Sequence, residues 1–174
     1  ILAAYAQAQS EVRKEDPKLL FSGRFPRMWE KMAAHFGVEM QPDDGRGFML
    51  SGRNWPPFAD SVEALQRLKR YFPVLVVATN GDRVSARAMA ANLGSPFTRV
   101  ITEADMGTNK PNRGAFEYFV GKVGELGIEK KRILHVAQSQ YHDIGAAKEF
   151  GPATCWIYRR HGEEGYGGTQ TPAQ

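Results

Sequence analysis

The feature that most constrains the fold is an alternation, from Phe58 onward, between short apolar runs and helical stretches. Residues 74–78 are continuously apolar and rich in valine, which is typical of a strand buried on both faces. Further strands are expected at 99–102, 133–137 and 153–158, with helices at about 60–72, 83–93, 112–126 and 143–150. Strands that alternate with helices predict an α/β fold with a mostly parallel sheet flanked by helices.

The first third of the chain has a different character. Residues 1–40 show no strand-like alternation and are expected to be helical, with Ser22 as a candidate N-cap of a second helix. Prolines and glycines crowd residues 41–57, which predicts a connector with little regular structure. We therefore expect a helical segment with its connector at 1–55, an α/β core at 56–160 and a disordered tail at 161–174.

Composition and charge exclude several classes of partner. The net charge of +4 comes from scattered basic residues, without the basic and aromatic run of a nucleic-acid groove. The longest apolar run, 74–78, is far too short to span a bilayer, so no membrane partner is expected. The single cysteine, Cys155, excludes an intrachain disulfide and fits a reducing, cytoplasmic compartment. We expect it to be a buried core thiol rather than a nucleophile.

Polar residues follow the first two predicted strands. In parallel sheets, ligands bind where the carboxyl ends of the strands emerge. Thr79 and Asn80 follow the first strand and can hold an anion, although a plain turn capped by Asp82 is an alternative. Lys110 follows the second strand and can place a positive charge over an anionic substrate or a carboxylate. A solvated loop lysine is the alternative there.

The loop after the third strand contains Ser139, His142 and Asp143. Asp143 can simply cap the helix that follows. A Ser–His–Asp triad is a poor interpretation, because triad members normally come from separate loops and no G-x-S-x-G elbow is present. The 4 histidines and 1 cysteine lack the spacing of a zinc site. No Gly-rich dinucleotide or phosphate loop follows any predicted strand.

Three segments in order carry a resemblance to a known family. Thr79-Asn80 at a strand end, Lys110-Pro111 in the next loop, and the run from His135 to Asp143 resemble the second, third and fourth motifs of the haloacid dehalogenase superfamily. The phrase 134–143 is most similar to that of the type II haloacid dehalogenase-like group. The resemblance covers about residues 55–160, and residues 1–40 are similar to the second part of the family's helical cap.

The resemblance implies a Rossmann-like core with a helical cap, and hydrolysis through an ester formed on an aspartate that ends the first strand of the family's sheet. It implies that Thr79 and Asn80 bind the anionic group of the substrate, and that Ser139 lines the same pocket. Lys110 would offset the negative charge of nucleophile and substrate. Asp143 would orient the hydrolytic water or position Lys110.

The sequence departs from the family pattern at two points. No apolar strand ending in a nucleophilic aspartate precedes the cap-like residues, so we expect a truncated chain, inactive alone, with two strands lacking their neighbour. Phosphatase members usually carry an acidic residue four positions before the one matching Asp143, which helps to hold magnesium, and here that position is Ser139. The resemblance thus favours chemistry without metal or cofactor, and magnesium is expected only of a phosphatase.

Three functions follow as hypotheses. The first is hydrolysis of a small 2-haloacid or similar anionic substrate, the second is a phosphatase of the same superfamily, and the third is a non-catalytic binding remnant. The expected partner is a small anionic organic molecule, and exposed strand edges make a homo-oligomer one of the expectations. Arg24 can face the pocket but is expected to be solvated.

Overall fold

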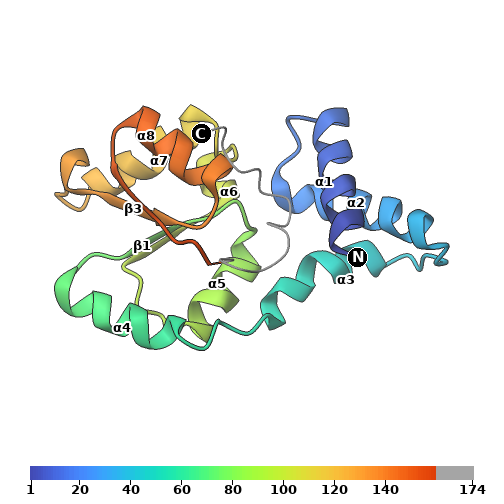
Figure 1. The fold of residues 1–174 in the computed structure, drawn as a ribbon, viewed down its shortest axis with the longest axis horizontal. Coiled ribbons are helices and arrows are strands. Elements are labelled where there is room, and N and C mark those ends of the chain that lie inside the picture. Colours follow the sequence, from blue (N-terminus) through green and yellow to red (C-terminus); the bar gives the residue numbers. More distant parts are fainter. Residues whose placement is uncertain (160–174) are drawn as a thin grey trace.

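The computed structural model describes residues 1–159. Its N-terminal part is a helical cap that lies beside the α/β core (Figure 1). The cap contains helices α1 (Leu2–Glu15), α2 (Phe21–Phe36) and α3 (Asp44–Ser51), followed by the short 3-10 turn η1 (Gly52–Asn54). The core contains α4 (Ser61–Tyr71), β1 (Val76–Ala78), α5 (Arg83–Asn92), β2 (Arg99–Ile101), α6 (Glu103–Met106), α7 (Arg113–Gly124), η2 (Lys130–Arg132), β3 (Leu134–Ala137), η3 (Gln140–Ile144), α8 (Gly145–Phe150) and β4 (Ala153–Trp156).

The prediction of an irregular connector at 41–57 is wrong, because this stretch contains α3 and η1. The reason is tertiary packing, which overrides the weak helix propensity of glycine. The Phe48 ring packs against Phe25 and Trp29 of α2, each with ring centroids 5.3 Å apart. Gly45 lets α3 approach α2, since a Cβ there would lie 2.8 Å from the Pro26 Cα.

The N-terminus of α2 also differs from the prediction. Ser22 lies inside the helix, and the N-cap position belongs to Leu20, whose side chain cannot accept a hydrogen bond. The carboxylate of Glu103 at the start of α6 takes that role from the core. The Ser22 amide donates to both of its oxygens, at 3.2 and 3.1 Å, and the Ser22 hydroxyl donates as well. A buried core residue thus ties the cap to the core.

The strands are parallel, as predicted, but they form two separate pairs. Val77 of β1 pairs with Val100 of β2, and Val136 of β3 pairs with Cys155 of β4. Within residues 1–159, no strand pairing joins β1 to β3. Helices α7 and α8 lie on one side of the strands and α4 and α5 on the other (Figure 1).

The core packs mainly on the α7 side of the strands. Phe116 and Phe119 of α7 are buried together with Ile101 and Ala147, and the His135 ring stacks on Phe119 at 5.6 Å between centroids. These contacts bring the third strand and its polar loop against α7. Asp82 caps α5 by accepting from the amides of Val84 and Ser85, both at 2.9 Å.

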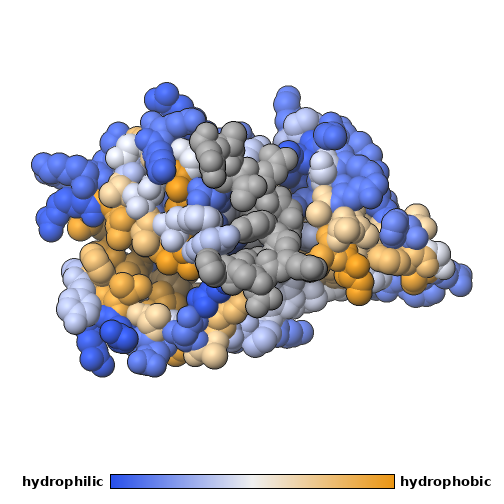
Figure 2. Space-filling view, in the orientation of Figure 1, coloured by the Kyte–Doolittle hydropathy of each residue, from blue (hydrophilic) through white to orange (hydrophobic). Residues whose placement is uncertain are grey.

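One face of the β3–β4 pair stays open. Leu134 and Val136 are each 48% exposed, and Cys155 is exposed too. The prediction of a buried thiol is therefore wrong, because no described helix covers this face of the strand pair. Figure 2 shows hydrophobic side chains at the surface over the strands. Across the described part of the chain, no helix has the length and apolar character needed to cross a membrane.

Candidate active site

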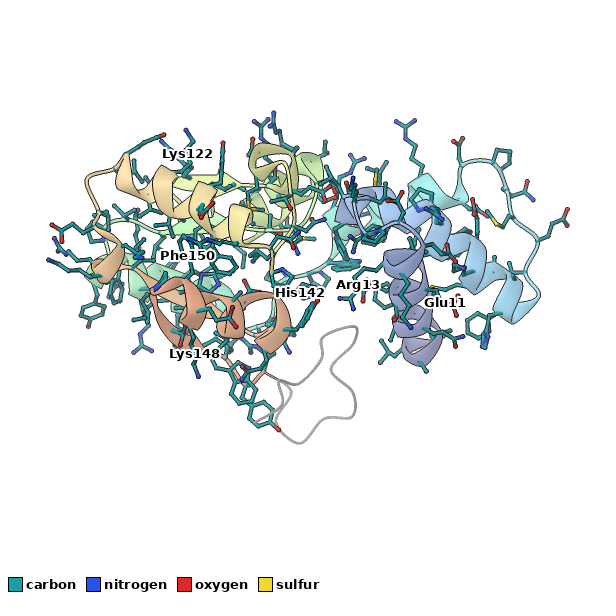
Figure 3. All side chains as sticks on the ribbon, turned by 90° about the horizontal axis from the view of Figure 1, so that it is seen from above. Glu11, Arg13, Lys122, His142, Lys148 and Phe150 are labelled. Carbon is teal, nitrogen blue, oxygen red and sulfur yellow. The ribbon has the colours of Figure 1, made fainter. Side chains whose placement is uncertain are left out.

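A cavity of about 310 Å³ lies between the cap and the carboxyl ends of β1 and β3. Its core wall comes from residues singled out in the sequence, and its roof comes from α1 and the first residue of α2 (Figure 3). The lining residues are Tyr5, Gln9, Phe21, Thr79, Asn80, Lys110, His142 and Asp143. Four predicted site residues from three successive loops thus meet at one place, and their roles remain predictions.

The loop after β1 shapes the cavity floor. The Thr79 amide donates to the Ile101 carbonyl at 2.9 Å, which extends the β1–β2 ladder, and the Thr79 hydroxyl accepts from the Gly81 amide at 3.0 Å. Asn80 uses both ends of its amide on the backbone of Lys110, donating to its carbonyl at 2.9 Å and accepting from its amide at 2.8 Å. Asn80 therefore fixes the lysine loop. Among residues 1–159 the Thr79 hydroxyl donates no hydrogen bond, so its hydrogen is available to a ligand.

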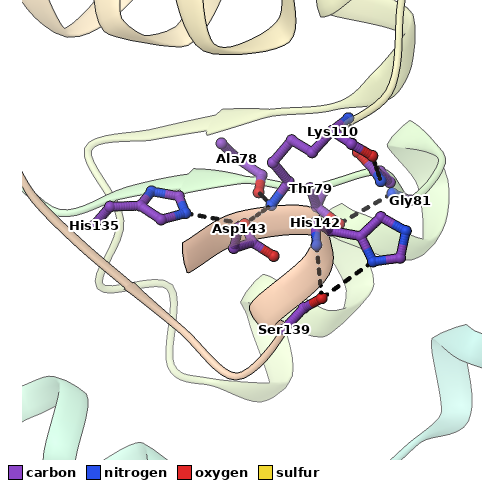
Figure 4. Close-up of polar contacts among 9 residues, drawn as sticks. Ala78, Thr79, Gly81, Lys110, His135, Ser139, His142 and Asp143 are labelled. Carbon is purple, nitrogen blue, oxygen red and sulfur yellow. Dashed lines mark hydrogen bonds and ion pairs between the residues drawn. The ribbon is translucent and has the colours of Figure 1, made fainter. Parts of the chain in front are cut away.

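Lys110 and Asp143 form a buried ion pair at the centre of the site (Figure 4). The Lys110 Nζ lies 2.5 Å from Asp143 Oδ1 and donates to the Ala78 carbonyl at 2.7 Å. His135 Nε2 donates to the same carboxylate oxygen at 2.9 Å. Burial by itself would raise the pKa of Asp143, but the His135 hydrogen bond and the Lys110 charge outweigh it and lower the pKa. Asp143 is therefore ionised and accepts hydrogen bonds from Lys110 and His135, which suits a residue that holds Lys110 in place.

Ser139 lies behind His142 rather than in the cavity wall. Its hydroxyl accepts from the His142 amide at 3.0 Å and lies 3.1 Å from His142 Nδ1. The Asp143 carboxylate is engaged by Lys110 and His135 instead. The three side chains thus form no triad. Ser139 contacts His142 and is not among the residues that line the cavity, and its part in substrate binding stays a prediction.

His142 and the cap residues were missed by sequence reasoning. Burial, followed by the charges of Lys110, Arg13 and Arg24, lowers the pKa of His142 to about 4, and Asp143 only partly offsets this. The ring is therefore neutral at pH 7. Its position next to Asp143 was the one local signal for it, whereas Tyr5, Gln9 and Phe21 carry no signal in the sequence.

Two cap arginines stand near the same wall. The Arg13 guanidinium lies 5.2 Å from the centroid of the Tyr141 ring. Arg24 is only 7% exposed, so the expectation of a solvated arginine is wrong. Its Nε donates to the Leu19 carbonyl at 2.9 Å, and neither arginine forms an ion pair with a carboxylate of residues 1–159. Both arginines thus place positive charge near the cavity, although the carboxylates of Glu103 and Asp16 also act on Arg24.

The donor set does not suit magnesium. Mg²⁺ takes oxygen ligands in near-octahedral geometry, and here the one cavity carboxylate, Asp143, is engaged by Lys110 and His135. In the part of the chain that the structure describes, no group of three or more His, Cys, Asp or Glu side chains could hold a metal ion.

Comparisons with known proteins identify the family and the fold of this chain. The family model of haloacid dehalogenase-like hydrolases matches residues 27–151. An (S)-2-haloacid dehalogenase from Pseudomonas putida is 26% identical over 130 residues, which cover 74% of this chain and 56% of that protein. The pyrimidine 5'-nucleotidase YjjG from Escherichia coli is 26% identical over 110 residues, covering 62% of this chain and 48% of that protein. The chain spans about half the length of the curated relatives it matches.

A solved structure shows the same fold. The L-2-haloacid dehalogenase from Xanthobacter autotrophicus superimposes with a TM-score of 0.74 at 21% identity, over 90% of this chain and 64% of that one. The fold is thus confirmed as Rossmann-like with a helical cap. Since the family model covers more than half of the sequence, this chain belongs to the haloacid dehalogenase-like hydrolases.

Proposed function

We propose that this chain supplies most of the active site of a hydrolase that acts on a small 2-haloacid or a similar anionic substrate through an aspartyl ester. One observation carries the proposal. A buried lysine, held by a carboxylate and a backbone carbonyl, lines a cavity of about 310 Å³ between the core and a cap that carries Arg13 and Arg24. A cavity of this volume lies at the small end of the range for ligand pockets.

The proposed chemistry divides the reaction into two displacements. A carboxylate oxygen attacks the carbon that bears the halogen, the carbon–halogen bond breaks, and the halide leaves with the bonding electrons. Water then adds to the carbonyl carbon of the ester, and cleavage of the acyl–oxygen bond returns the carboxylate and releases the hydroxy acid and a proton. Lys110 stabilises negative charge in both steps, and the Thr79 hydroxyl donates to the substrate anion.

The attacking carboxylate is a separate requirement. Asp143 is unsuited to it, because Lys110 and His135 both occupy its Oδ1. The proposal places the nucleophile on a further strand between β1 and β3, where residues 1–159 provide no strand pairing. Such a strand would end beside Ala78, within reach of Lys110.

The names of the relatives support the substrate class. The matched proteins from Pseudomonas are (S)-2-haloacid dehalogenases, and a 2-haloacid is a small anion that the Lys110 ammonium group in the cavity can attract. The single cysteine fits a reducing compartment, so the proposal includes a cytoplasmic location. The open face of β3–β4 is the surface through which we propose that copies of the chain would associate, which size-exclusion chromatography tests.

The test compares the 174-residue chain with a version extended by the residues encoded immediately upstream of it. With (S)-2-chloropropionate, we expect chloride release from the extended protein and none from the 174-residue chain. Lys110→Met in the extended protein should abolish release, while Lys122→Met, at a partly exposed position of α7 that does not line the cavity, should leave it unchanged. Turnover by the 174-residue chain, or an unaffected Lys110→Met variant, would contradict the proposal.

A phosphatase is the second candidate, because the similarity to a pyrimidine 5'-nucleotidase is at the same level of identity. Activity on phosphate monoesters that a chelator abolishes would favour it. If the extended protein turns over neither halogenated acids nor phosphate esters, and Lys110→Met leaves ligand binding intact, the non-catalytic binding function holds instead.

A further inference from the structure

His142 is held in one orientation by two contacts with Ser139. The Ser139 hydroxyl oxygen accepts a hydrogen bond from the His142 amide at 3.0 Å and lies 3.1 Å from the ring Nδ1 (Figure 4). Because this oxygen is already an acceptor for the backbone, its own hydrogen is available for the ring. The hydroxyl can therefore donate to Nδ1, and in the tautomer with Nδ1 unprotonated both atoms are satisfied.

The other ring nitrogen then carries the proton. Nε2 has no hydrogen-bond partner within residues 1–159, while the ring lines the cavity. Among residues 1–159, the fully buried side-chain polar atoms without a partner belong to Trp29, Ser85 and Asn109. Nε2 of His142 is therefore not fully buried and is accessible from the cavity. A largely buried ring with one satisfied nitrogen and one donor open to the cavity can give a hydrogen bond to a ligand acceptor.

The charges around the ring favour a neutral donor and an anionic ligand. Lys110 and Asp143 face it from the core, where they neutralise each other. Arg13 and Arg24 face it from α1 and α2, and Figure 3 shows Arg13 and His142 on either side of the boundary between cap and core. Burial chiefly lowers the pKa of the ring, the charges of Lys110, Arg13 and Arg24 add to this, and Asp143 opposes them. A neutral ring near these cations can donate a hydrogen bond to an anion.

We infer that His142 is a further substrate-binding residue, whose Nε2–H donates a hydrogen bond to the anionic or departing group of the ligand in the cavity. Ser139 is its positioning residue, because the hydroxyl fixes the tautomer. The inference rests on the proposed function for the kind of ligand, a small anion, and on the geometry for the donor. It assigns the loop Ser139–His142 a role in substrate recognition that the Lys110–Asp143 pair does not fill.

The tautomer is tested without any activity. Two-dimensional ¹⁵N–¹H spectroscopy of the imidazole rings of the 174-residue chain, at pH 7, distinguishes a protonated from an unprotonated ring nitrogen. His142→Gln identifies the signal by its loss. We expect a single neutral tautomer with the proton on Nε2, and a mixture of tautomers in Ser139→Ala. A proton on Nδ1, or a wild-type ring that exchanges freely between both forms, overturns the inference.

Ligand contact is tested by titrating sodium propionate, an unreactive analogue of a 2-haloacid, and sodium chloride into the same chain. We expect the Nε2 signal to shift with either anion. His142→Ala should weaken binding about tenfold, as expected for loss of one hydrogen bond to a charged group. His142→Gln keeps a donor near the position of Nε2 and should lose no more than about threefold. His35→Ala, at the exposed end of α2, is the matched control and should bind like the wild type.

Failure of the inference differs from failure of the proposed function. Anion binding that leaves Nε2 unshifted, equal binding by His142→Ala, or no binding by the wild type overturns the role of His142. The proposed function depends instead on turnover by the extended protein and on Lys110. If His142→Ala does not fold, the wild-type tautomer and the His142→Gln titration still decide the question.

Discussion

Two carboxylates are buried in the core, Glu103 at the start of α6 and Asp143 in η3. Their pKa values shift in opposite directions. Asp143 is 7% exposed and Glu103 is 2% exposed. The pKa of Asp143 is lowered although burial opposes it, because a hydrogen bond from His135 and the charge of Lys110 prevail. The pKa of Glu103 is raised, because burial outweighs the hydrogen bonds from Ser22 and the Phe21 amide. The same chemical group at similar burial thus titrates in different directions.

The difference lies in the charge of the partners. Asp143 faces a cation, so its ionised form is stabilised and can in turn hold Lys110 in the cavity. Glu103 faces neutral donors at the start of α2, and the carboxylate of Asp82 adds repulsion. Asp143 thus has a cationic partner at hydrogen-bond distance, whereas Glu103 joins the cap to the core through hydrogen bonds from neutral donors, with Arg24 acting on it only through its charge.

The largest expected effect comes from removing the cation. Lys110→Met keeps the apolar stem but leaves Asp143 buried without its charged partner, so we expect a loss of about 3–5 kcal/mol in the free energy of unfolding. Urea unfolding at pH 7 measures it. A loss below about 1 kcal/mol would show that the two carboxylates do not differ in this way.

The next effect is a pH dependence that belongs to His142. Its pKa falls from 6.5 to about 4 on folding. The stability contributed by the neutral ring is therefore complete above pH 6.5 and is lost as the pH falls toward 4. The loss is on the order of 3 kcal/mol. Thermal unfolding between pH 7 and pH 4 should show this slope in the wild type, and His142→Gln should remove it.

The contribution of Glu103 to the free energy of unfolding should change with pH in the opposite direction to that of Asp143. Because its folded pKa is raised, its contribution is complete below the unfolded value of 4.5 and is lost as the pH rises through the raised pKa. The contribution of Asp143 is present above 3.8 and is lost as the pH falls through its lowered pKa. Glu103→Gln should therefore flatten the loss of stability above pH 4.5, and an unchanged pH profile would remove the contrast.

At neutral pH, Glu103→Ala should cost about 1–3 kcal/mol, because the amide and hydroxyl of Ser22 lose their acceptor. The same substitution should increase the rate of protease cleavage at the boundary between cap and core. Asp105→Ala on the same helix is a control for α6 itself, since Asp105 caps that helix through Thr102.

The smallest effect sets the baseline for the comparison. Arg113 and Glu117 form an ion pair 2.8 Å apart on α7, with side chains 82% and 54% exposed. Glu117→Ala should change the free energy of unfolding by less than about 0.5 kcal/mol, because solvent screens exposed pairs. An effect as large as that of Lys110→Met would mean that burial does not govern these ion pairs.

Local patterns identified much of this molecule. Short apolar runs followed by polar loops indicated parallel strands with their loops at one end of the sheet. The structure brings Thr79, Lys110 and Asp143 from three of these loops to one cavity. Spacing also indicated α2 and the core helices α4, α5, α7 and α8, and composition indicated α1, whereas α6 lies where a loop was expected. These features depend on the periodicity of the backbone and on residues adjacent in the chain, which any reader of the sequence can see.

The remaining features depend on partners far apart in the chain. Glu103 caps a helix that begins 81 residues earlier, Phe48 makes a helix of a glycine-rich stretch by packing against α2, and the cap places Phe21 over the cavity. Whether a buried carboxylate is ionised, or a histidine neutral, depends on which charges the fold brings within a few ångströms. Residue types and spacing thus determined the order of the helices and strands and which functional groups are present. The three-dimensional contacts determined the protonation state and the hydrogen-bond partners of each group.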